Sequence, residues 1–194
     1  MREEIGNGFR HFFRLVSLFT SEALANRDYH MCVRIREVKD EEVPTIRRWL
    51  GDPLFRSEFL AFGRDSDSAV SEKLGDVVRG TEEASYLAVE RIKGSKLVGL
   101  LFYHKVPNFH YFEAGFYVIP EERGKGYGTE AMRLLLEHIF EMRSAKTIVA
   151  GTSSLNVASQ KALLKAGFKK VGVLKKTLFR NGVWEDSIIY QVSV

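Results

Sequence analysis

The sequence has little of several features that mark particular classes of protein. Its single cysteine, Cys32, can form neither an intrachain disulfide nor a cysteine-based metal cluster, and we expect it to be a buried strand residue in a protein of a reducing compartment. No apolar run approaches the roughly 18 residues that cross a bilayer. The net charge of only +4 is too small to predict a nucleic-acid partner. We therefore expect a cytoplasmic protein that neither spans a membrane nor binds nucleic acid.

Hydrophobic residues, in contrast, make up 45% of the 194 residues, enough for one domain with a substantial core. Residues 1–30 stand apart from the rest as an extension in which apolar side chains recur at helical spacing with basic ones opposite. This amphipathic helix is expected to pack on the body or on a second subunit of a homodimer, with a membrane-surface helix as the alternative. Met31 would serve equally well as an internal start. The apolar set is Phe9, Phe12, Phe13, Val16 and Phe19.

Residues 31–194 alternate between strand-like and helix-like patterns and form the main domain. Strands lead, helices cross over and antiparallel strands close the chain, which predicts an α+β fold on one mixed, mostly antiparallel sheet of about seven strands flanked by helices. Strands are expected at residues 32–38, 85–92, 97–106, 109–119, 146–152, 171–179 and 183–192, and helices at residues 41–50, 68–80, 126–142 and 156–167.

The stretch RGKGYGTEAM, residues 123–132, joins a strand to a helix and is rich in glycine. It lacks the G-x-x-x-x-G-K-[ST] pattern of a nucleoside triphosphate loop. Gly126, Gly128 and Ala131 satisfy a dinucleotide fingerprint, but the acidic residue expected about 20 residues on is missing, because that position is Gly151. Bare backbone amides at a helix N-terminus still predict an anion site, with a glycine turn that only packs as the alternative.

The strings VIPEERGKGYGTEAM, NVASQKALLKAGF and GVWEDSIIYQV together resemble the GNAT superfamily of N-acetyltransferases, and most of all its RimJ/RimL branch. The resemblance covers residues 32–194. It implies the GNAT fold, acetyl-CoA as co-substrate, no metal, and direct attack of a primary amine, with a protein N-terminus favoured over a small-molecule amine. The cofactor residues it implies are Phe116, Val118, Arg123, Gly124, Lys125, Gly126, Tyr127, Gly128, Thr129, Asn156 and Ser159.

The catalytic candidates are Glu113, Asn156 and Ser159. Glu113 is the one carboxylate in an otherwise apolar central strand, so we expect burial to raise its pKa toward that of a useful base, unless it pairs with a basic neighbour. By the resemblance, catalytic glutamates in histone-type relatives lie one residue earlier, where this chain has Phe112. A β-bulge could turn the Glu113 side chain to the same face of the strand, whereas a regular strand would not. We expect Glu113→Gln to lower turnover at least about tenfold with little change in acetyl-CoA affinity.

Asn156 stands where it can cap its helix, and by the resemblance it also contacts the pantetheine arm. The family's usual acid, a tyrosine, is replaced by Leu163, which leaves Ser159, a water molecule or solvent to protonate the thiolate, with Tyr190 as a further candidate that suits a core position better. This loss leaves a second hypothesis open, a non-catalytic acyl-CoA sensor.

The acceptor is expected to contact Trp49, Arg56 and Glu58, around the long connection at residues 51–67. Ordinary solvated surface charge is the alternative for these positions.

Overall fold

The computed structural model describes residues 31–51, 84–142, 145–180 and 182–194. The chain divides after Met31, and the helices and strands that the structure describes belong to the unit Cys32–Val194. The extension at residues 1–30 and the helix expected at residues 68–80 lie outside the described residues. In the described part of the chain no helix is long and apolar enough to cross a membrane.

One sheet organises this unit, and its described strands follow the order β1-β2-β3-β4-β5-β7-β6. All neighbours are antiparallel except β4 and β5, so the mixed, mostly antiparallel seven-stranded sheet of the sequence analysis is confirmed, with β4 at its centre. The strands are β1 (Val33–Glu37), β2 (Ala84–Arg91), β3 (Lys96–Lys105), β4 (Phe112–Val118), β5 (Thr147–Ser153), β6 (Lys169–Arg180) and β7 (Val183–Ser193).

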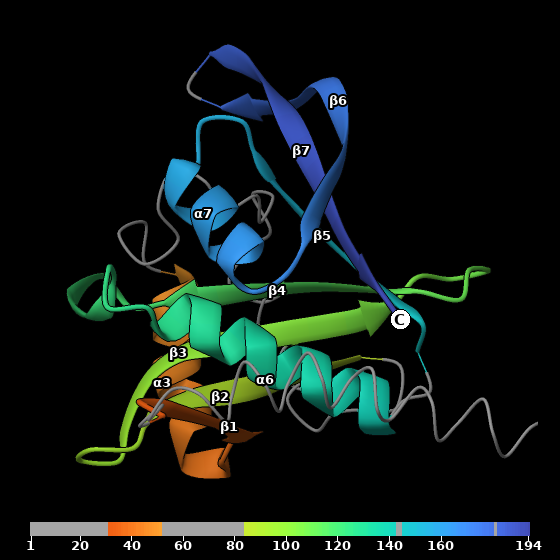
Figure 1. Ribbon diagram of the computed structural model, residues 1–194. Coiled ribbons are helices and arrows are strands. Elements are labelled where there is room, and N and C mark those ends of the chain that lie inside the picture. Colours follow the sequence, from red (N-terminus) through yellow and green to blue (C-terminus); the bar gives the residue numbers. More distant parts are fainter. Residues whose placement is uncertain (1–30, 52–83, 143–144, 181) are drawn as a thin grey trace, which may run out of the picture. The chain divides into compact units, whose positions relative to one another are not determined.

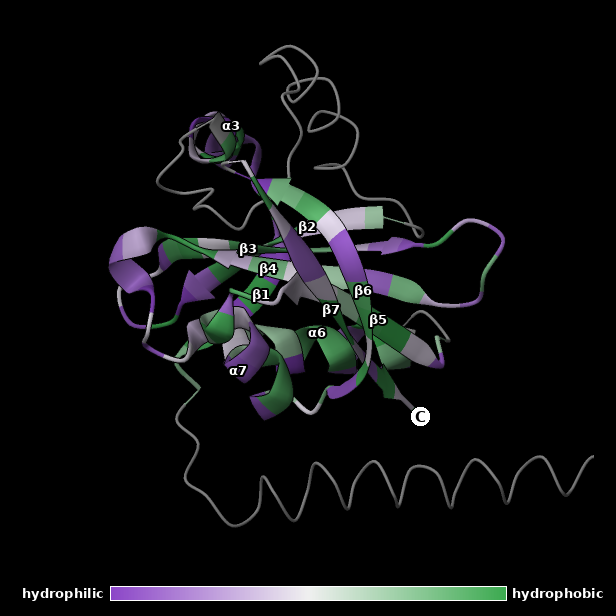
Figure 2. Cartoon of the chain, turned by 90° about the horizontal axis from the view of Figure 1, so that it is seen from above, coloured by the Kyte–Doolittle hydropathy of each residue, from purple (hydrophilic) through white to green (hydrophobic). Residues whose placement is uncertain are grey.

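Helices α3 (Val43–Gly51) and α6 (Tyr127–Met142) cover opposite faces of the sheet (Figure 2). The larger core lies under α6, whose apolar stripe is fully buried because its side chains recur at the helical period. A smaller core lies under α3. The α6 stripe consists of Ala131, Met132, Leu135, Leu136 and Ile139, and the α3 core of Ile46, Leu50, Leu100 and Ile119.

The sheet opens between its two parallel strands. β4 and β5 pair only at Phe112 with Ile148 and at Glu113 with Val149. Beyond these pairs β5 follows β7, with which it pairs along its whole length, and the two strands diverge on either side of helix α7 (Val157–Lys165; Figure 1). Since hydrogen bonding stops there, the inner edge of β4 faces a gap rather than a neighbouring strand.

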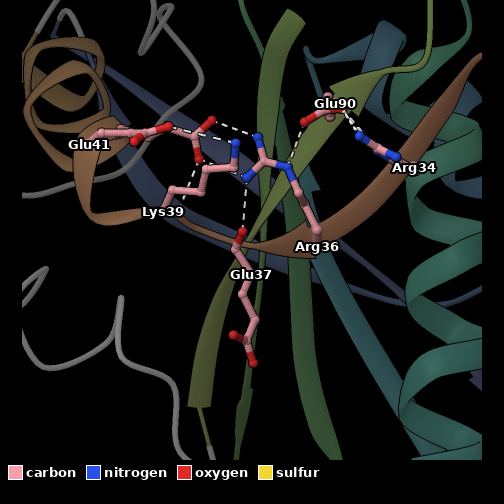
Figure 3. Close-up of polar contacts among 7 residues, drawn as sticks. Arg34, Arg36, Glu37, Lys39, Glu41 and Glu90 are labelled. Atoms are coloured by element: carbon pink, nitrogen blue, oxygen red, sulfur yellow. Dashed lines mark hydrogen bonds and ion pairs between the residues drawn. The ribbon is translucent and has the colours of Figure 1, made fainter. Parts of the chain in front are cut away.

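The other end of the sheet is fixed by an ion-pair network around Arg36 (Figure 3). The Arg36 guanidinium donates to Glu90 on β2, with Nε 2.6 Å from Oε2, and to both oxygens of Glu42 in the short helix η2 (Asp40–Glu42), at 2.7 and 2.6 Å. These hydrogen bonds raise the pKa of Arg36, those to Glu42 more than the one to Glu90. The network ties β1 and β2 to the start of α3.

Cys32 does not occupy the buried strand position expected for it. It is exposed and precedes β1, which begins at the buried Val33. Because side chains alternate along a strand, the burial of Val33 directs its neighbour outward. The prediction of a buried cysteine is therefore wrong.

Candidate functional site

The gap between β4 and β5 is a cleft of about 1350 Å³, walled by β4 on one side and by β5 and α7 on the other. The glycine-rich connection before α6 closes one end. All the predicted cofactor residues line this cleft except Lys125. Segments far apart in the sequence thus meet at one cleft.

The inner edge of β4 presents its main chain to the cleft. The Ile119 amide donates to the Val98 carbonyl at 2.9 Å, toward β3. Backbone groups of successive strand residues point to opposite edges, so those of Val118, and of Phe116 two residues earlier, point toward the gap. Arg123 Nε donates to the Val118 carbonyl at 2.9 Å, from that open side. An extended ligand can therefore lie along β4 as an added strand would.

The glycine loop brings bare backbone to the end of the cleft. Gly124 and Gly126 adopt φ of +77° and +88°, in the left-handed region that favours glycine. Gly128 lies in the first turn of α6, and a Cβ there would be 2.4 Å from Cε2 of Phe116. The first amides of α6 have no intrahelical acceptor, and together with the loop amides they suit a diphosphate.

A buried carboxylate that sequence reasoning missed holds the loop in place. Glu122, at the end of the short helix η3 (Pro120–Glu122), is only 4% exposed. Its oxygens lie 2.7 Å from Lys125 Nζ, 3.0 Å from Lys96 Nζ and 3.3 Å from Arg91 Nη1. Lys125 and then Lys96 lower the pKa of Glu122 to about 2. Lys125 thus braces the loop through its side chain, and the i, i+3 spacing from Glu122 was the available sequence signal.

Asn156 and Ser159 stand together on the α7 wall. The Asn156 Oδ1 accepts the Ser159 amide at 3.1 Å, which confirms the predicted helix cap. Ser159 lines the cleft, as does the apolar Leu163. Tyr190 is a core residue, as expected, with its hydroxyl 3.5 Å from Gln160 Oε1 and its pKa raised by burial. Ser159 is therefore better placed than Tyr190 to pass a proton to the thiolate.

Glu113 lies on the opposite face of β4 from the one that packs against α6. The β3–β4 register is regular, without a bulge, so Phe112 is buried beneath α6 and Glu113 points away from it. The Glu113 side chain is 48% exposed, with Oε2 3.3 Å from Nε2 of His104. His104 lowers the Glu113 pKa. The expectation of a buried glutamate with a raised pKa is wrong, and pairing with a basic neighbour is what the structure shows.

A row of aromatic rings shares that face with Glu113. Phe102 stacks on Tyr117 at a centroid distance of 5.5 Å and lies 6.1 Å from Tyr86, and all three line the cleft. The ring of Phe102 covers Gly115, where a Cβ would be 2.3 Å from Cε1. This row and His104 went unrecognised in the sequence because their strands read as ordinary core segments.

Of the three residues predicted to contact the acceptor, the structure describes only Trp49. Trp49 packs against the core under α3 and does not line the cleft. Arg56 and Glu58 lie outside the described residues. Within the ranges that the structure describes, no group of three or more His, Cys, Asp or Glu side chains is arranged to hold a metal ion.

Comparison with known proteins identifies the family. Residues 33–169 match the acetyltransferase (GNAT) domain family. A stretch of 72 residues, 37% of this chain, is 40% identical to the probable N-acetyltransferase YjcK of Bacillus subtilis (strain 168) and spans only 40% of that protein's length.

Two solved structures show the same fold. The ribosomal-protein-S5-alanine acetyltransferase of Vibrio fischeri is 24% identical with a TM-score of 0.71, covering 84% of this chain and 93% of that one. The spermidine N-acetyltransferase of Vibrio cholerae, in complex with CoA and spermine, is 17% identical with a TM-score of 0.73, covering 83% and 95%. Since the family match extends over well more than half of the sequence, the chain belongs to the GNAT acetyltransferase family.

Proposed function

We propose that this protein is an acetyl-CoA-dependent N-acetyltransferase of the RimJ/RimL type that transfers the acetyl group directly to a primary amine, with the α-amine of a protein N-terminus as the favoured acceptor. The observation that carries the proposal is the opening of the sheet between β4 and β5, with a glycine loop at one end and the Glu113–His104 pair at the last β4–β5 backbone pairing.

The lining of the cleft offers groups suited to the diphosphate, the pantetheine arm and the thiol of coenzyme A. Loop amides from Arg123 to Thr129 would hold the diphosphate, and the main chain of Phe116 and Val118 would pair with the pantetheine arm. Asn156 and Ser159 lie on the facing wall, where they would contact the thiol end. When bound, the cofactor supplies an acetyl group activated as a thioester.

The cost of making the amine neutral favours an α-amine as the acceptor. At pH 7 a lysine-like amine with a pKa of about 10.4 loses its proton at a cost of about 4 to 5 kcal/mol, whereas an α-amine near 7.7 to 8 costs only about 1 kcal/mol. The cleft offers no carboxylate of raised pKa among its described residues, since the pKa of both Glu113 and Glu122 is lowered. A weakly basic α-amine needs the least help from such a site.

A direct assay tests the function. The full chain would be incubated with acetyl-CoA and a panel of amines: peptides with a free N-terminus, the same peptides with only a free lysine, and spermidine. Release of free thiol and calorimetry with CoA would be measured in parallel. We expect CoA to bind and N-terminal peptides to react fastest at pH 7.

The other outcomes are equally informative. Binding of CoA without thiol release for any amine would support the sensor hypothesis instead. Absence of CoA binding would refute both functions.

A further inference from the structure

The imidazole of His104 lies beside Glu113 at the point where β4 and β5 separate. We propose that His104 is the base that takes the proton of the acceptor amine, and that Glu113 is the residue that positions it. This inference rests on the proposed transferase function and assigns a catalytic role to a residue that the family resemblance does not include.

The register of the sheet creates the pair. His104 and Glu113 are direct partners in the antiparallel β3–β4 ladder, so their side chains leave the same face. Nε2 of His104 lies 3.3 Å from Oε2 of Glu113. A carboxylate at Nε2 fixes the proton on that nitrogen and leaves the lone pair on Nδ1, the atom that can accept a proton from a substrate.

The pair lies where acceptor and thioester would meet. Glu113 forms the last β4–β5 backbone pair, with Val149, so the cleft begins beside it. The side chains of His104 and Glu113 both line the cleft, and they are 44% and 48% exposed, respectively. Tyr86 and Phe102 extend the same face over β2 and β3, whereas the other face is covered by α6. An amine can therefore reach His104 without crossing the α6 layer.

The interaction between His104 and Glu113 favours the imidazole over the carboxylate as the general base. His104 lowers the pKa of Glu113, which makes this carboxylate a weaker base than an ordinary one. An imidazole is the side chain that most often serves as a general base in enzymes, because one of its nitrogens carries a lone pair when the ring is neutral. In this arrangement the negative charge of Glu113 stabilises the imidazolium that forms when His104 accepts a proton.

No other described group on the cleft competes for this role. Glu113 and Glu122 are the only carboxylates and His104 the only imidazole among the cleft residues that the structure describes, and Glu122 is held by its three cations. Burial raises the pKa of the Tyr86 and Tyr117 hydroxyls, which therefore stay protonated. The remaining charged side chains facing the cleft from other elements are the cations Arg123, Lys161, Lys165 and Arg180.

The proton balance is complete with this assignment. An acceptor that arrives as an ammonium gives its first proton to Nδ1 of His104, which returns it to solvent. The neutral amine then forms the N–C bond as the C–S bond breaks. The second amine proton goes to the departing sulfur, directly or through the Ser159 hydroxyl. Each turnover releases one proton, one free thiol and one acetylated amine.

The experiment compares H104Q, E113Q and the control H110Q, which makes the same change at an exposed histidine of the same β3–β4 hairpin, away from the cleft. We expect H104Q to lower kcat about 100-fold and E113Q about tenfold, with KM for acetyl-CoA unchanged and H110Q at the wild-type rate. In H104Q the pH profile of kcat/KM should lose the inflection that the wild-type profile owes to this imidazole.

A measurement without turnover checks the pairing itself. Carbon-13 NMR of the Glu113 carboxyl in the cofactor-free protein should show its pKa rising toward the ordinary value in H104Q and staying in place in H110Q. A loss of kcat in H104Q equal to or smaller than that in E113Q, or an unchanged pH profile, would overturn the proposal. An inactive wild-type enzyme would instead refute the proposed function.

Discussion

Gly128 shows at the scale of one residue how the cleft depends on a missing side chain. Its position in the first turn of α6 brings the main chain against the ring of Phe116, whose own backbone faces the gap. The ring is partly buried against the core under α6, so it has little room to withdraw. One glycine thus sets the distance between the helix amides and the strand edge that would together hold the ligand.

We therefore expect Gly128→Ala to weaken CoA binding and to lower the free energy of unfolding by roughly 1 to 3 kcal/mol, the usual cost of overpacking. The added Cβ would lie 2.4 Å from Cε2 of Phe116. Gly172→Ala is the matched control, because nothing lies within 4 Å of a Cβ there. Thermal melts and calorimetry with CoA measure both effects. Equal behaviour of the two variants would contradict the steric argument.

Glu122 is one of the carboxylates whose lowered pKa makes the stability of the fold depend on acidic pH. Its pKa is lowered from 4.5 to about 2 by Lys125 and Lys96, so the unfolded chain binds the proton first as the pH falls. The stabilisation is fully present above pH 4.5 and is lost as the pH drops toward 2. We expect Glu122→Gln to lower the Tm at pH 7. The difference in Tm between this variant and the wild type should shrink as the pH falls from 4.5 toward 2. The exposed neighbour gives the control, Glu121→Gln, which should leave the Tm unchanged. A difference in Tm between Glu122→Gln and the wild type that stays constant with pH would contradict this account.

At the scale of elements, the Arg36 network couples the first strand to the helix that precedes the long connection (Figure 3). Glu90 is 3% exposed, so it depends on protein partners rather than on water. Arg36 supplies one of these partners from a side chain that is itself only 20% exposed, whereas Arg34, the other partner, is 57% exposed. The buried arginine should therefore matter more than the exposed one.

We expect Arg36→Leu to lower the free energy of unfolding by roughly 1 to 3 kcal/mol, because it leaves the buried Glu90 with fewer donors. Arg34→Leu removes a largely solvated partner of the same carboxylate and should cost less than about 1 kcal/mol. Urea titration of both variants gives the comparison. Similar losses in the two would show that burial of the arginine does not decide the effect.

For the whole unit Cys32–Val194, the opening between β4 and β5 divides one continuous sheet into two wings that meet only at two backbone pairs. The core under α6 draws on both wings, with Leu101 and Tyr103 from one and Ile148 and Tyr190 from the other. A ligand that bridges the gap would therefore stabilise the unit as a whole rather than one strand.

Coenzyme A should accordingly raise the Tm, with a gain of about 2.7 kcal/mol at a free concentration 100 times its Kd. Hydrogen exchange should slow at the amides of Phe116 and Val118, which point toward the gap, and change little at β2. Exchange would be followed by NMR with and without CoA. Protection confined to the glycine loop would contradict the strand-like binding of the pantetheine arm.

Local features of this protein were predictable because they depend on neighbours in the sequence. The periods of 2 and 3.6 residues marked the described strands and helices, and Asn156 was identified as a cap three residues before the amide that it accepts. The stretch RGKGYGTEAM likewise predicted a glycine loop at the start of α6. Within the described residues these predictions agree with the structure.

The tertiary structure alone decided which distant residues become partners. The register of β3 against β4 sets Glu113 beside His104, and folding gathers Arg91, Lys96 and Lys125 around Glu122. Neither the lowered pKa of Glu113 nor the exposure of Cys32 follows from their own segments. Sequence periodicity specifies which face a side chain leaves, whereas the electrostatic environment on that face depends on strands paired across the sheet.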